Sequence, residues 1–109
     1  MQIYTDLEEI MAQSQGRKSI TLLDEKNGCV AGCRSGITIY DETEYGKGGI
    51  HKDQEGFFVL SGAGMAKIGE AEFAIHEGMS FLAPAGVHHV VKSNSADVPV
   101  KVFWFHSAV

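Results

Sequence analysis

At 109 residues the chain has room for one domain, and its hydrophobic content of 44% is enough for a packed core. The formal net charge is −5, with acidic and basic residues interspersed, so no basic stripe is present and we expect no nucleic-acid partner. The apolar runs are too short to cross a bilayer, and the N-terminal MQIYTDLEEI has acidic residues where a signal peptide needs a basic start. We therefore expect a cytoplasmic protein without a membrane partner and with a single domain over residues 1–109.

A helical pattern occurs only near the N-terminus. Asp6 is suited to the N-cap, and Glu9 stands three positions later, as in a capping box. Gly16 is suited to end the helix. The short apolar stripe between them consists of Leu7, Ile10 and Met11.

From Ser19 onward, short apolar or alternating runs are separated by turn residues. Their spacing of roughly ten residues predicts eight strands in an antiparallel sandwich or barrel. A two-residue turn at Gly69 and Glu70 predicts a hairpin between two of the runs. The runs are SITLL (19–23), GITIY (36–40), GFFVL (56–60), GMAKI (64–68), EFAI (72–75), MSFLA (79–83), HHVVK (88–92) and VKVFWF (100–105).

Residues 46–62 read GKGGIHKDQEGFFVLSG, with His51 four positions before Glu55 and six residues between Glu55 and Gly62. This stretch resembles the first motif of the cupin family, which reads glycine, five residues, His-x-His, three or four residues, glutamate, six residues and glycine. His51 matches the second histidine of that motif. Gly49 stands where the family has the first histidine, which is a departure from the pattern.

Residues 78–94 read GMSFLAPAGVHHVVKSN and resemble the second cupin motif. That motif reads glycine, five residues, Pro-x-Gly, two residues, histidine, three residues and asparagine. Its asparagine is displaced by one position here, to Asn94. Both motifs occur in order, with a short spacer of fifteen residues between them. The residues that match in full are Gly78, Pro84, Gly86 and His89.

The resemblance implies an all-β fold, a double-stranded β-helix or jelly-roll barrel, preceded here by a short N-terminal helix. It also implies a mononuclear site for a divalent transition metal (Fe, Mn, Ni or Zn) held by His51, Glu55 and His89. Simple geometry agrees, because residues four apart on a strand face the same side. Two imidazoles and a carboxylate are a ligand set suited to these metals, and three protein ligands leave positions open for water or substrate.

Other polar residues near the motifs have more than one interpretation. Asp53 can supply an oxygen ligand if its strand is unbroken, but we expect it to lie solvated in a turn. His88 is expected to face outward, because adjacent strand residues face opposite sides. If the even-numbered face of residues 100–106 points inward, Trp104 and His106 approach the pocket; otherwise the odd-numbered phenylalanines fill the core.

The functional hypothesis is a metal-dependent small-molecule cupin of oxygenase, isomerase or lyase type, with its ligand inside the barrel over the metal. The alternative is a non-catalytic module that binds a sugar or small organic acid, with the metal site weakened by Gly49. No general acid or base is identified. Phe57, Phe58 and Phe81 are candidates for the apolar wall of the ligand pocket, and only the ones that face inward qualify. Because the run VKVFWF is apolar on both faces, we expect a homodimer.

Overall fold

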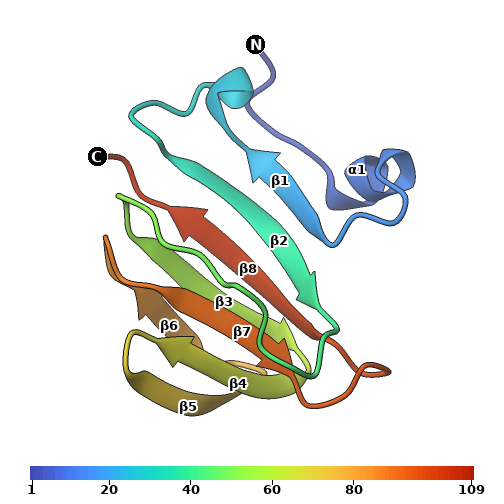
Figure 1. Cartoon of the computed structure of the whole chain (residues 1–109). Coiled ribbons are helices and arrows are strands. Elements are labelled where there is room, and N and C mark those ends of the chain that lie inside the picture. Colours follow the sequence, from blue (N-terminus) through green and yellow to red (C-terminus); the bar gives the residue numbers. More distant parts are fainter.

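Two antiparallel β-sheets form the body of the protein (Figure 1). The structure is a computed structural model that describes all of residues 1–109. The elements in chain order are α1 (Leu7–Gln13), β1 (Ser19–Leu23), the 3-10 turn η1 (Glu25–Asn27), β2 (Arg34–Tyr40), β3 (Glu55–Ser61), β4 (Ala63–Ile68), β5 (Ala71–His76), β6 (Ser80–Ala83), β7 (His89–Ser93) and β8 (Val100–His106).

The larger sheet has the strand order β1-β2-β8-β3-β6, and the smaller has the order β5-β4-β7. The chain passes from one sheet to the other and back, so that strands distant in sequence become neighbours. In particular β8 lies between β2 and β3, and β7 pairs with β4. The all-β jelly-roll prediction and all eight predicted strands are therefore confirmed.

The core lies between the sheets and is built by alternation along the strands. On β3, Phe57 and Val59 are buried, whereas Phe58 between them is exposed. On β8 the even-numbered residues face inward: Val102 is fully buried, and the indole of Trp104 donates a hydrogen bond to the Thr38 hydroxyl at 2.8 Å. Of the two orientations left open for residues 100–106, the structure has the one that turns Trp104 and His106 inward.

Two glycines explain local features of the sheets. Gly69 has a φ of 59° and forms the predicted hairpin between β4 and β5, because a left-handed conformation suits a two-residue turn. Gly36 on β2 leaves room for the Trp104 ring, since a Cβ at this position would collide with the indole and with the carbonyl of Ile20.

The helix α1 lies beside β1 at the edge of the larger sheet, and none of its residues is buried (Figure 1). As predicted, Asp6 caps it by accepting from the backbone N–H groups of Glu8 and Glu9. The helix ends at Gln13, earlier than Gly16 had suggested, with Ser14 as its C-cap. No helix in the chain has the length and apolar character needed to span a bilayer.

Candidate metal centre

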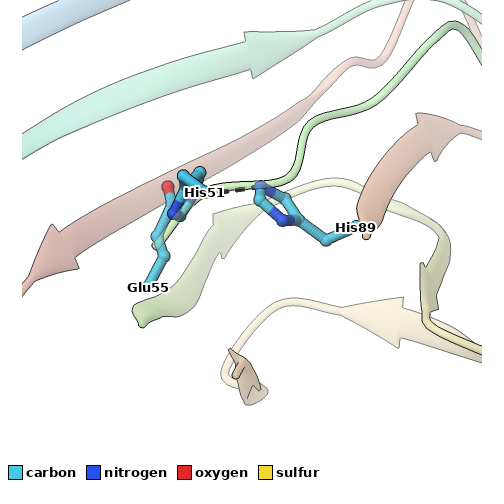
Figure 2. A group of neighbouring side chains, drawn as sticks. All are labelled: His51, Glu55 and His89. Carbon is cyan, nitrogen blue, oxygen red and sulfur yellow. Dashed lines mark hydrogen bonds and ion pairs between the residues drawn. The ribbon is translucent and has the colours of Figure 1, made fainter. Parts of the chain in front are cut away.

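The fold brings His51, Glu55 and His89 together (Figure 2). His51 lies in the loop before β3, Glu55 is the first residue of β3, and His89 is the first residue of β7, on the other sheet. The Nε2 atoms of His51 and His89 are 3.1 Å and 3.3 Å from the same oxygen, Oε1 of Glu55. Figure 2 shows the three side chains pointing toward one another from separate segments of the chain.

Backbone hydrogen bonds tie the two sequence motifs to each other at this point. Gly49 and His89 exchange N–H···O bonds in both directions, each 2.9 Å long. The N–H of Gly86 donates to the carbonyl of His51 at 2.8 Å. The loop that carries His51 is therefore anchored to β7 and to the turn before it, and this anchoring fixes the relative positions of His51 and His89.

Two further residues, Asp53 and His106, border the cluster. His106 is the last residue of β8 and lies opposite Glu55 in the β3–β8 register, with only 5% of its side chain exposed. Its Nδ1 donates to Oδ2 of Asp53 at 2.8 Å, and its Nε2 is 3.5 Å from Oε1 of Glu55. The expectation that Asp53 is solvated was wrong: its side chain is 19% exposed and contacts two histidines. Alternation along β8 indicated that His106 shares a face with Trp104, but it did not indicate which face points inward.

The remaining histidines lie outside the cluster. His88 is exposed, as predicted, and its Nε2 donates to the carbonyl of Lys47 at 2.7 Å. His76 is exposed at the end of β5. Of the candidate wall residues, Phe57 is buried and stacks on Phe81 with ring centroids 4.7 Å apart. Phe58 faces away from the interior.

The charges within the cluster stabilise one another. Burial by itself raises the pKa of the Glu55 carboxyl, but the hydrogen bond from His89 and the charges of His106 and His89 outweigh burial, so the net pKa is lowered. The hydrogen bond to Glu55 raises the pKa of His89, against an opposing effect of burial. Glu55 is therefore an anionic carboxylate at neutral pH, which is the protonation state that a metal ligand needs.

A cavity of about 330 Å³ reaches the cluster at His89. Tyr40 lies on its wall, and burial, followed by the charge of Glu55, raises the pKa of the Tyr40 hydroxyl, so this phenol is neutral. Local sequence patterns do not show that Tyr40 lines the cavity. The direction of its side chain depends on which face of β2 is turned toward the interior. The cavity is lined by Tyr40, Glu42, Glu44, Gly46, Gly48, Gly49, His89, Val90 and Val91.

The donor set fits a divalent transition metal. Ligands bonded to one ion at about 2.0–2.2 Å stand about 3.0–3.5 Å apart, and the contacts to Oε1 of Glu55 from His51 and His89 fall in this range, at 3.1 Å and 3.3 Å. Fold and site together define a small antiparallel barrel with a histidine–carboxylate group of metal-binding character.

A family model described as "Cupin domain" matches residues 38–106, more than half of the chain. The protein therefore belongs to the cupin family. No curated protein matches the sequence significantly.

Solved structures show the same fold at low sequence identity. The cupin domain of Schizosaccharomyces pombe Cnp3 superposes with a TM-score of 0.71 and 14% identity, covering 84% of this chain and 60% of that one. The chain thus spans three-fifths of the length of that structure. The TT1209 protein of Thermus thermophilus has a TM-score of 0.67 and 20% identity, with 96% and 97% of the two chains covered. A cupin 2 domain-containing protein of Halorhodospira halophila has a TM-score of 0.71 and 11% identity, with coverages of 87% and 66%.

Proposed function

We propose that the protein binds a divalent transition metal through His51, Glu55 and His89 and holds a small molecule in the adjoining cavity. The observation that carries this proposal is the approach of two imidazole Nε2 atoms to one carboxylate oxygen, in a cluster whose side chains are only 10–28% exposed. A carboxylate in such a position is costly unless a cation or hydrogen bonds compensate it, and a metal held by the same three side chains would supply the cation.

A bound metal would supply Lewis-acid polarisation of a ligand oxygen or, for a redox metal, O₂ chemistry. The chain's own residues would bind and orient the ligand. Because His89 lines the cavity together with Glu42 and Glu44, a ligand there would lie beside one of the metal ligands and share the cavity with two carboxylates. The neutral Tyr40 hydroxyl is available on the wall as a hydrogen-bond donor.

The cavity lining favours a neutral polar ligand over an organic acid. It contains Glu42 and Glu44 but no lysine or arginine, so a carboxylate ligand would meet like charges there and find no cationic side chain. Glutamate carboxylates accept hydrogen bonds from hydroxyl groups. We therefore propose a sugar or another polyhydroxylated compound as the ligand class.

A non-catalytic binding module is the second candidate function, and Gly49 is the observation that favours it. The family's first histidine is absent at this position, and a site with one imidazole fewer binds metal less tightly. In this alternative the cavity binds the polyhydroxylated ligand without turnover.

Elemental analysis of the tag-free protein, with His89→Ala purified in parallel, tests the metal site. We expect near-stoichiometric Fe, Mn, Ni or Zn in the wild-type protein and almost none in the variant, because His89 supplies one of two imidazoles in the predicted ligand set. A His76→Ala variant, altered at an exposed histidine, is the matched control and should retain the metal. If the wild-type protein takes up no metal even after reconstitution, the metal-dependent proposal is wrong and the binding module is favoured.

We also propose that the protein forms a homodimer through the outer face of its larger sheet. This face carries large apolar side chains on the adjacent strands β8, β3 and β6, and such contiguous patches are rare on monomers. A second copy of the same face is the occupant of matching chemistry. The exposed apolar residues are Phe58, Leu60, Leu82 and Phe105.

We expect Leu82→Lys to shift the protein from dimer to monomer in size-exclusion chromatography with light scattering, because the new charges would face each other in the interface. Val98→Lys places the same charge on an exposed residue outside the strands and should remain dimeric. A wild-type protein that is monomeric at high concentration would contradict the proposed interface.

A further inference from the structure

The buried imidazole of His106 is the strongest feature that the three-residue metal site does not use. His106 belongs to neither cupin motif stretch; it is supplied by β8, at the position opposite Glu55 in the sheet. Same-face cross-strand partners stand close enough for their side chains to act on one atom. His106 as a whole residue is 4% exposed, and the centroid of its ring lies 4.8 Å from that of the His51 ring.

The two nitrogens of His106 have different surroundings. Nδ1 is committed to Asp53, since a carboxylate oxygen can only accept and the N–H must be on the ring. With the proton on Nδ1 committed to Asp53, Nε2 is the nitrogen left to bind a metal, and it lies 3.5 Å from Oε1 of Glu55. The Nε2 atoms of His51, His89 and His106 therefore surround a single oxygen at 3.1, 3.3 and 3.5 Å.

Asp53 holds two of these three rings. Its Oδ1 is 2.9 Å from Nδ1 of His51, and its Oδ2 is 2.8 Å from Nδ1 of His106. A carboxylate that accepts from Nδ1–H fixes the tautomer and orientation of a metal-binding histidine. Oδ2 of Asp53 is used in this way by His106, whereas Nδ1 of His51 donates to the backbone carbonyl of Asp53 at 2.9 Å. The carboxylate therefore orients His106, and the main chain of residue 53 orients His51.

Resting on the metal-binding function proposed above, we propose that His106 is a fourth protein ligand of the metal through Nε2, and that the Asp53 carboxylate is the positioning group for His106. The site would then have three imidazoles and one carboxylate, with the third imidazole supplied by β8 instead of by position 49.

A separate second metal between His51, Asp53 and His106 is a less favourable interpretation of the same residues. It would use Nδ1 of His51 while Nε2 of that ring serves the first metal, and an imidazole that binds two metals must lose both of its N–H protons. It would also replace the hydrogen bonds that the carboxylate and the backbone carbonyl of Asp53 accept from His106 and His51.

Zn²⁺ titration of wild-type protein carrying ¹⁵N-labelled histidine tests the proposal without any substitution. The chain has five histidines. We expect the ring-nitrogen signals of three of them to move to metal-bound values on Nε2 at one Zn²⁺ per chain, while those of His76 and His88 do not. Only two responding rings, or uptake of a second Zn²⁺ at an Nδ1 atom, would overturn the assignment of His106.

Variants then identify the third ring and the function of Asp53. His106→Gln should weaken Co²⁺ binding at least about tenfold and remove one responding ring, whereas His76→Gln should do neither. Asp53→Asn should weaken binding by about 10- to 100-fold while all three rings still respond. In the metal-free state, its His106 ring should show mixed tautomers in place of the Nδ1–H form, whereas His51, which donates to the backbone carbonyl of residue 53, should keep its tautomer.

The outcomes separate this inference from the proposal on which it rests. Co²⁺ binding that is unchanged in His106→Gln, with three rings still responding, would overturn the fourth ligand alone. A wild-type protein that binds neither Co²⁺ nor Zn²⁺ would overturn the metal site as a whole. If His106→Gln does not fold, as judged by circular dichroism, the wild-type titration and Asp53→Asn still decide the question.

Discussion

Replacing Gly49 by histidine is expected to tighten Zn²⁺ or Co²⁺ binding at least about tenfold, because the substitution adds an imidazole beside the existing ligands. Gly49 pairs with His89 across an isolated bridge, and a Cβ at this position would stand 3.8 Å from Cε1 and Nε2 of His89. That distance is an ordinary van der Waals contact. The φ angle of Gly49 is not positive, so a larger residue causes no backbone strain.

Competition titration with a chromophoric chelator measures this gain, and Gly49→Ala is the matched control. Alanine makes the same backbone change without the imidazole and should leave the metal affinity unchanged. If His106 is a ligand, the gain from Gly49→His should be larger in the His106→Gln background, since the new ring would then restore a missing donor. Equal affinities for Gly49→His and Gly49→Ala would show that position 49 does not reach the metal.

The strands could be predicted from the sequence because their signals are local. Alternation within SITLL or GITIY, and a turn such as Gly69–Glu70, depend only on neighbouring residues. The convergence of His51, Glu55 and His89 could be predicted because the two stretches that carry them resemble the cupin motifs. The fold holds these stretches together through the backbone bonds between Gly49 and His89.

The rest of the site depends on contacts between distant segments. Whether His106 faces inward is decided by the pairing of β8 with both β2 and β3, which no local pattern contains. Asp53 does lie in a turn, as its surroundings indicated, but that turn is covered by His51 and His106. The position of Tyr40 on the cavity wall likewise depends on which face of β2 points inward. No pattern of neighbouring residues could predict that face.

Phe57→Ala is expected to lower the free energy of unfolding by about 3–5 kcal/mol, whereas Phe58→Ala should cost less than about 1.5 kcal/mol. Phe57 is 1% exposed and stacks on Phe81, so its removal leaves a cavity in the core. Phe58 is 43% exposed on the outer face. Urea denaturation monitored by Trp104 fluorescence measures both losses. Equal losses would contradict the inward and outward assignment on β3.

The comparison isolates the direction of the side chain, because the two residues are of one type and adjacent on one strand. Strand propensity and the loss of aromatic surface in the unfolded chain are nearly the same for both substitutions. Protein concentration adds a second distinction. If the outer face is the dimer interface, Phe58→Ala weakens association, and its cost should grow with protein concentration. The cost of Phe57→Ala, which arises inside one subunit, should not depend on concentration.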